Sequence, residues 1–290
     1  MLRRDFLLIL TLFSVGALLP LSGAASVSVP HAYEVRSVAE PVLRSEKSRI
    51  LFKLLTEMPS TAKRDELSRR WKAIDVVAKS LGWDHWEDTV KESEWNMLTH
   101  FRQQSSTTVM GKEDSKNGSS RELGVRNWVA AERQVRHWAS LGSHPTADRI
   151  LLLNKMLGEG LDNNFHEPGV PRQYEFPDWF SAFSAHDLDE SLSHFDRWYE
   201  EARTRLHPVE LATLAYQRLI TIHPTPDGNG RTSRLVLDWI LLLNGLPPAA
   251  FPNSASSVIH RSVNPDRDVP VDASLERVTR AVEYSLQLLR

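Results

Sequence analysis

Apolar residues recur at helical spacing along most of the chain, and this periodicity constrains the fold more than any other feature. Leucine, isoleucine, valine and tryptophan return every three or four residues, which places them on one face of an α-helix. Strand-like alternation of apolar and polar residues is nearly absent. The sequence therefore predicts an all-α protein, with its nine tryptophans as core and packing residues.

The periodic segments give the bounds of the expected helices and of the loops between them. Residues 104–120 are polar and show no periodicity, so they are expected to form a linker. Residues 165–178 contain three prolines and one glycine, and they are expected to form a loop with a short β-hairpin around Val170–Phe176. Helices are expected over residues 43–55, 67–81, 84–102, 121–141, 147–158, 187–204, 208–222, 230–244 and 274–289.

The composition limits the class of protein. With 290 residues, of which 41% are hydrophobic, the chain is long enough for one large domain or two smaller ones. The absence of cysteine excludes a disulfide scaffold, a thiolate zinc site and a cysteine nucleophile. Lys and Arg total 35 against 37 Asp and Glu, and this near balance argues against nucleic acid as the partner.

Residues 1–25 have the layout of a secretory signal peptide. Arg3 and Arg4 form a positive start, Leu7–Leu21 is an apolar stretch, and the small residues 22–25 suit a cleavage site. The stretch is shorter than a typical membrane-spanning helix of about 20 residues. The two arginines fit an ordinary secretory signal or a twin-arginine signal, and an uncleaved membrane anchor is a third alternative. The protein is therefore expected to be exported, either to the periplasm or out of the cell.

One segment, residues 222–234, combines residue types that suit phosphate chemistry. An apolar helical stripe from Leu211 to Ile222 precedes it, and residues 235–243 are apolar on almost all sides, as in a buried helix. Two prolines stiffen the segment, and Asn244-Gly245 followed by two more prolines ends the second helix. The sequence predicts two helices joined by a tight loop.

The predicted loop carries groups that an anion site needs. The N–H groups of residues 228–231 are expected at the start of the second helix, where the helix dipole attracts anions. Gly228 and Gly230 are expected to let the backbone approach a ligand and to adopt positive φ angles. Arg231 and Arg234 lie three residues apart, so they share a helix face and can clamp phosphate oxygens.

Two more residues of this segment suit a transfer reaction. Asp227 is a hard oxygen ligand for a phosphate-bound Mg²⁺, and His223 is a natural general base for a hydroxyl that attacks phosphorus. An EF-hand is excluded because its sixth and twelfth positions would be Thr232 and Asp238. A plain ion pair between Arg234 and Asp238, four residues apart, and a stiff connector without a ligand are the remaining alternatives. The co-occurrence of base, acid, glycines and two arginines favours a functional anion site.

This segment resembles the signature of the Fic family of protein AMP-transferases, H-x-F-x-[DE]-G-N-G-R-x-x-R. Every specified position except the phenylalanine is matched between His223 and Arg234. A looser resemblance covers about residues 145–250. It includes Pro168-Gly169 to Arg172, which is similar to the family's substrate-positioning flap. The resemblance implies a Fic-like helical bundle.

The resemblance also implies a reaction. In such enzymes the histidine takes the proton from a Ser, Thr or Tyr hydroxyl of a target protein. The hydroxyl oxygen attacks the α-phosphate of ATP, and pyrophosphate leaves. The acidic residue holds Mg²⁺, the Gly-Asn-Gly loop cradles the phosphates, and the arginines bind the β- and γ-phosphates. Carried over, the base is His223, the Mg²⁺ ligand is Asp227, and the nucleotide-binding residues are Gly228, Asn229, Gly230, Arg231 and Arg234.

Two further features follow from the same resemblance. Thr225 stands where the family has phenylalanine, whose ring anchors the loop, so this chain loses apolar burial there but no reacting group. Many family members carry an inhibitory helix with [ST]-x-x-x-E-[GN], whose glutamate pairs with the second motif arginine. The best match is residues 279–284, with Glu283 as the inhibitory candidate, although Tyr284 breaks the last position. The alternative for Glu283 is a solvated helix-face residue.

The expected organisation combines these elements. A leader covers residues 1–25, an N-terminal helical region 26–103, the linker 104–120, and a Fic-like domain 121–290 with its core at about 145–250. The expected activity is Mg²⁺-dependent transfer of AMP from ATP to a protein hydroxyl. The alternatives are a related transfer in the same pocket (another nucleotide, phosphate, phosphocholine, or removal of AMP) and an exported phosphate-binding interaction protein with weak catalysis. Export is in tension with ATP as the donor, because the bacterial envelope holds little ATP.

Overall fold

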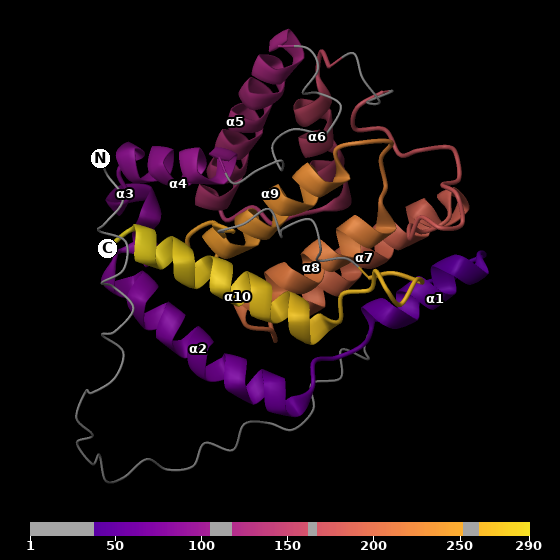
Figure 1. Ribbon diagram of the computed structural model, residues 1–290, viewed down its shortest axis with the longest axis horizontal. Helices are drawn as coiled ribbons and strands as arrows, with labels where there is room; N and C mark the ends of the chain where they lie inside the picture. The colour runs from indigo at the N-terminus through magenta and orange to yellow at the C-terminus, as the bar shows by residue number, and fades with distance from the viewer. Residues whose placement is uncertain (1–37, 105–117, 162–166, 252–260) are drawn as a thin grey trace, which may run out of the picture. The chain divides into compact units, whose positions relative to one another are not determined.

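Figure 1 shows the computed structural model of the chain. The described residues, 38–104, 118–161, 167–251 and 261–290, lie in one compact unit that runs from Val35 to Arg290. The expected all-α fold is confirmed, because these residues form helices and no strand. The expected leader at residues 1–25 and most of the expected linker, residues 105–117, lie outside the described residues.

The helices follow the periodic segments of the sequence closely. Side-chain caps are present at several helix starts, such as Thr146, whose hydroxyl accepts the Arg149 N–H at 3.4 Å. The helices are α1 (Glu46–Leu55), α2 (Thr61–Ser80), α3 (Trp86–Thr89), α4 (Glu92–Gln104), α5 (Gly118–Ser140), α6 (Ala147–Gly158), α7 (Leu188–Ala202), α8 (Pro208–Ile222), α9 (Asn229–Leu242) and α10 (Val271–Leu288). Short 3-10 turns lie at Trp83–His85 and Ala185–Asp187.

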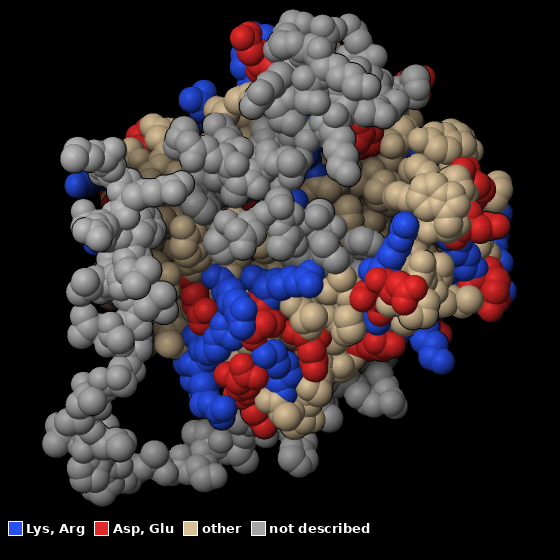
Figure 2. Space-filling model, viewed as in Figure 1, with Lys and Arg blue, Asp and Glu red and all other residues tan. Residues whose placement is uncertain are grey.

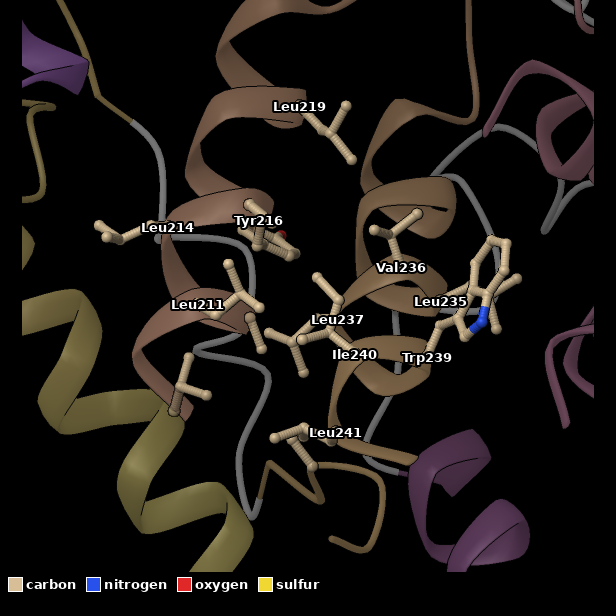
Figure 3. Packing of buried hydrophobic residues seen from close by; sticks show 14 of the residues in the cluster. Leu211, Leu214, Tyr216, Leu219, Leu235, Val236, Leu237, Trp239, Ile240 and Leu241 are labelled. Atoms are coloured by element: carbon tan, nitrogen blue, oxygen red, sulfur yellow. The ribbon is translucent and has the colours of Figure 1, made fainter. Parts of the chain in front are cut away.

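Helix α9 is the centre of the core, as its apolar sequence predicts. The apolar residues between positions 235 and 242 have exposed fractions of 3% or less, and α8 packs along them. Figure 3 shows Leu211 and Leu219 of α8 pointing toward α9. On another side of α9, Trp239 stacks on Trp138 of α5 with ring centroids 4.8 Å apart. Burial of each large apolar side chain contributes about 1.5–3 kcal/mol, so this helix holds the surrounding helices in place.

Helix α10 packs against both α2 and α8. In the α2–α10 contact, the Trp71 Nε1 donates to the Thr279 hydroxyl at 2.9 Å. Arg70 of α2 donates to the carboxylates of Glu276 and Glu283 of α10 at distances of 2.7–2.8 Å. Figure 2 shows basic and acidic side chains side by side over these two helices. Helices from the N-terminal part of the chain are therefore packed on the C-terminal helix.

The expected helix at residues 84–102 is wrong in its bounds. The chain instead forms a 3-10 turn, the short helix α3 and then α4, with an extended residue Val90 between them (φ −81°, ψ 119°). The Thr89 hydroxyl lies 2.8 Å from the His85 carbonyl oxygen, and the Lys91 N–H donates to the Glu94 carboxylate at 2.7 Å. Such side-chain bonds offer the backbone an alternative to continuing the helix, and they start a new one.

The expected β-hairpin around Val170–Phe176 is also wrong. This stretch is irregular and contains no strand. The backbone N–H of Arg172 donates to the carbonyl of Pro224 at 2.8 Å instead of pairing across a hairpin. Pro171 and Pro177 have no N–H to offer a ladder, which is a physical reason why the hairpin does not form.

The tryptophans are core residues with one clear exception. Trp179 is 66% exposed, so the expectation of core packing is wrong for this residue. Seven tryptophans are at most 5% exposed: Trp71, Trp83, Trp86, Trp95, Trp128, Trp198 and Trp239.

In the part of the chain that the structure describes, no helix has both the length and the apolar character needed to cross a bilayer.

Candidate functional site

The loop at residues 223–228 joins α8 to α9 and carries the candidate base. His223 ends α8 in a left-handed conformation (φ 53°, ψ 58°), and its N–H donates to the Leu219 carbonyl at 3.0 Å. Its Nδ1 lies 3.2 Å from the Ile220 carbonyl oxygen, which can only accept, so Nδ1 is the donor. A neutral ring that donates from Nδ1 has its lone pair on Nε2. This tautomer suits a general base.

The start of α9 provides the expected anion-binding backbone. Gly228 is the N-cap and has a left-handed conformation (φ 79°, ψ −2°), as predicted for this glycine. Its N–H donates to Asp227 Oδ1 at 2.5 Å. The Asp227 side chain is 39% exposed, and its Oδ2 lies 3.9 Å from Arg231 Nη2. The carboxylate therefore lies beside the positive end of the helix dipole and still reaches solvent.

The second glycine of the motif has a different role from the predicted one. Gly230 is helical and does not have a positive φ, so that prediction is wrong. Among the described residues outside the backbone of α9, the atom nearest to a methyl group at this position would be Ile220 Cδ1, at 4.0 Å. These residues therefore leave room for a methyl group at the first turn of α9.

Both motif arginines lie in the first two turns of α9. Arg231 is 6% exposed and Arg234 is 7% exposed, so both guanidinium groups are nearly buried. A cation near a helix N-terminus is electrostatically unfavourable, and two buried ones there favour a site for an anion. The structure brings His223, Asp227, Gly228 and both arginines to the same end of α9, as the sequence predicts.

Thr225 anchors the loop by hydrogen bonds in place of apolar burial. It is 1% exposed, and its hydroxyl lies 2.9 Å from the Asp227 carbonyl oxygen and 2.8 Å from Asn229 Oδ1. Its N–H donates to Asn229 Oδ1 at 3.0 Å, and Asn229 Nδ2 donates to the Thr225 carbonyl at 2.6 Å. The Asn229 side chain, expected to bind nucleotide, is thus used inside the loop.

Sequence reasoning missed Asn154, a buried residue of α6 that is 1% exposed. Its Nδ2 donates to the Asp227 carbonyl at 2.8 Å and lies 3.3 Å from the Thr232 hydroxyl, while its Oδ1 accepts the Gly169 N–H at 2.9 Å. Asn154 therefore ties the motif loop to the segment that begins near residue 167. A polar residue within the apolar run of residues 150–157 is the signal that could have indicated it.

The segment at residues 167–184 lies against the candidate base. Arg172, expected on a flap, is only 3% exposed, and its Nε donates to the His223 carbonyl at 2.9 Å. The rings of Phe176 and Phe180 contact the imidazole edge to face, with centroids 5.2 and 5.0 Å away. Burial lowers the pKa of Arg172, although a guanidinium stays protonated in proteins. Arg172 is therefore part of the support of His223 and not of an exposed flap surface.

The structure does not bring Glu283 to the other motif residues. Both of its carboxylate oxygens accept hydrogen bonds from Arg70 of α2, at 2.8 and 2.7 Å. The resemblance implies a pair with Arg234, and the structure gives Glu283 a different partner at the α2–α10 contact. Within the described ranges, no group of three or more His, Cys, Asp or Glu side chains could hold a metal ion.

Comparison with known sequences agrees with the geometry. Residues 144–241 match the model of the Fic/DOC family. The chain is 31% identical over 167 residues to uridine 5'-monophosphate transferase of Xanthomonas campestris pv. campestris, a match that covers 53% of this chain and 30% of that protein. It is 44% identical over 72 residues to protein adenylyltransferase Fic of Drosophila melanogaster, covering 24% of this chain and 15% of that protein. This chain thus spans less than a third of the length of these relatives.

Solved structures share the fold. A Fic-domain signalling protein from Bacteroides thetaiotaomicron superposes with a TM-score of 0.59 at 19% identity, over 76% of this chain and 95% of that chain. The IbpAFic2 domain, solved covalently tethered to Cdc42, gives a TM-score of 0.58 at 18% identity, over 82% of this chain and 77% of that chain. Residues 144–241 of this chain therefore form a Fic/DOC-family domain, and the chain shares the fold of these solved Fic-domain structures.

Proposed function

We propose that this protein transfers a nucleoside monophosphate from a nucleoside triphosphate to a Ser, Thr or Tyr hydroxyl of a target protein. The observation that carries the proposal is the meeting of His223 with the N-terminal end of α9, where Gly228 and two nearly buried arginines favour an anion. The relatives named as AMP and UMP transferases support the same class of reaction.

In the proposed step, the hydroxyl oxygen of the target forms a bond to the α-phosphorus of the donor. The bond from that phosphorus to the bridging oxygen breaks, and pyrophosphate leaves with the electron pair. His223 Nε2 takes the hydroxyl proton. Arg231, Arg234 and the first N–H groups of α9 hold the phosphates in line with the acceptor. Such transfers depend mainly on positioning and on charge stabilisation, which these groups supply.

Asp227 is the proposed Mg²⁺ ligand. Mg²⁺ commonly binds through one or two carboxylates together with substrate phosphates, so a lone exposed carboxylate beside an anion site fits an ion that arrives with the nucleotide. The bound ion would supply charge neutralisation on the phosphates. We expect chelation of Mg²⁺ to abolish transfer without lowering the melting temperature.

AMP from ATP is the first candidate for the transferred group, and UMP from UTP is the second. The UMP-transferase relative favours the second because its match extends over 53% of this chain, against 24% for the adenylyltransferase. Export through the predicted leader is proposed as well. It bears on the donor, because ATP is scarce in the bacterial envelope. Mass spectrometry of the mature N-terminus would test cleavage near residue 25.

The test of the proposed function uses the purified full chain with Mg²⁺ and the four nucleoside triphosphates. Each is labelled in turn at the α- or the γ-phosphate, and labelled protein is detected by mass spectrometry. Transfer of the α-label alone, lost in His223→Ala by about 100-fold or more, is the expected result. Transfer of the γ-label would contradict the proposal and indicate phosphorylation. Nucleotide binding without any transfer, to itself or to a lysate, would support the alternative of a binding protein.

A further inference from the structure

Arg172 is a buried cation whose three side-chain nitrogens all donate to backbone carbonyl groups. Nε donates to His223 at 2.9 Å, Nη1 donates to Tyr174 at 2.8 Å, and Nη2 donates to Phe183. The face of the guanidinium lies 4.9 Å from the centre of the Phe176 ring. With an exposed fraction of 3%, this side chain is used entirely inside the protein. It is not available to reach a ligand.

The backbone that Arg172 holds is an unusual one. His223 has a left-handed conformation, which costs a non-glycine residue about 1 kcal/mol or more and persists only where the surroundings impose it. Arg172 binds the two consecutive carbonyl groups that follow this strained φ and ψ pair. Its Nε donates to the His223 carbonyl, and its backbone N–H donates to the Pro224 carbonyl at 2.8 Å.

Arg172 also supports the imidazole ring of His223, through the ring of Phe176. Phe176, on which the Arg172 guanidinium lies, contacts the His223 ring edge to face at 5.2 Å. The planar guanidinium fork therefore fixes the His223 backbone directly and the imidazole through one aromatic ring. A lysine ammonium is a point charge without this fork, so it cannot make the same three bonds at once.

We propose that Arg172 is a positioning residue for His223, fixing the base in its left-handed conformation while making no contact with substrate. This inference rests on the proposed function, in which His223 is the base and the donor phosphates bind at the start of α9. Because the donor site lies on α9, loss of Arg172 should lower kcat and leave the KM for the donor unchanged. A small misplacement of a catalytic group costs about 100-fold, which is the loss of kcat expected for Arg172→Met and Arg172→Lys.

The matched control is Arg261→Lys. Arg261 is also buried, with a side chain 3% exposed, and it donates to the Leu54 carbonyl at 2.7 Å, away from α9. Pyrophosphate release from ATP and from UTP would be measured for both lysine variants, together with their melting temperatures. A loss of kcat in Arg172→Lys, at a melting temperature similar to that of Arg261→Lys and with unchanged donor KM, supports the proposal. Full activity, a change confined to KM, or equal losses in both variants overturns it.

A second measurement separates this inference from the proposed function. With ¹⁵N-histidine labelling, the amide and imidazole signals of His223 should shift in Arg172→Lys and stay in place in Arg261→Lys. This holds even if the wild type transfers no nucleotide. Unmoved His223 signals in Arg172→Lys would overturn the positioning role, whether or not the protein is an enzyme.

Discussion

Two irregular segments meet at His223, and they are held in different ways. The motif loop, residues 223–228, is closed by partners close in sequence, such as Thr225 and Asn229, which are four residues apart. The segment at residues 167–184 is held by partners far away in sequence. Arg172 binds a residue 51 positions away, and the Ser184 N–H donates to the hydroxyl of Ser48, 136 positions away. The short loop is therefore shaped partly by its own residues, although Asn154 and Arg172 also bind its carbonyl groups, whereas the second segment depends more on the assembled helices.

The largest expected effect on stability is at the base of the second segment. An alanine methyl at Gly169 would lie 2.7 Å from the Leu151 carbonyl oxygen and from Lys155 Cβ, at a φ of 79°. Gly169→Ala should lower the free energy of unfolding by about 3 kcal/mol, measured by urea denaturation. Gly124→Ala is the matched control, since no atom of the described residues lies within 4 Å of its added methyl. Equal stability of the two variants would show that residues 167–184 do not depend on this contact.

The next effect is expected at the link between the two segments. Asn154→Leu removes the partner of the Gly169 N–H and one partner of the Asp227 carbonyl, and should cost about 2 kcal/mol. Hydrogen exchange at the Gly169 amide should become faster. Asn127→Leu is the control, because Asn127 Nδ2 also donates to a backbone carbonyl, that of Glu159 at 2.8 Å. If both variants behave alike in exchange at Gly169, the two segments are not linked through Asn154.

A smaller loss is expected inside the motif loop. Thr225→Val keeps the shape of the side chain and removes its hydroxyl bonds to Asp227 and Asn229, which should cost about 1 kcal/mol. Thr225→Phe should cost more, because the cavity beside Thr225 has a volume of only about 10 Å³. Thermal unfolding of both variants measures this. A phenylalanine variant more stable than wild type would mean that hydrogen bonds are the poorer anchor.

A pH-dependent difference in stability is expected from Glu175 of the second segment. Although burial raises its pKa, bonds from the Ser184 hydroxyl at 2.6 Å and the Ala185 N–H at 2.8 Å hold it below the ordinary value of 4.5. A carboxylate with a lowered folded-state pKa stabilises the fold above about pH 4.5, and this contribution disappears as the pH falls further. Glu175→Gln should therefore melt slightly lower than wild type at pH 7. At pH 3 the difference should be smaller, and a constant difference would contradict the assignment.

No loss of stability is expected at Gly230. Its helical backbone tolerates a methyl group, whose nearest neighbour among the described residues outside α9 would be Ile220 Cδ1 at 4.0 Å, and alanine is the better helix former. Gly230→Ala should melt at or above the wild-type temperature. If the donor phosphates approach this turn, its KM for the nucleotide should rise, because the methyl occupies their space. Unchanged KM and kcat would mean that phosphate lies elsewhere on α9.

The site could be predicted in part. The motif indicated one anion site with a base beside it. The structure does bring its residues, His223, Asp227, Gly228 and the two arginines, to one end of α9. The roles of Gly230 and Arg172 were not predictable. Gly230 looks like a turn residue until the N-cap is known to be Gly228, and Arg172 looks like part of a substrate-positioning flap until its three carbonyl partners are known.

The sequence by itself determined the all-α class, most helix ends and the tight loop between the two helices that flank the motif. These depend on periodicity, caps and hydrogen bonds between residues about four positions apart, which the order of residues states directly. The tertiary structure decided that Glu283 binds Arg70 and that Asn154 joins the motif loop to the segment at residues 167–184. It also decided that Arg172 donates a hydrogen bond to the carbonyl of the strained His223. Partners separated by tens to hundreds of positions are set by how helices pack, and no local pattern records that choice.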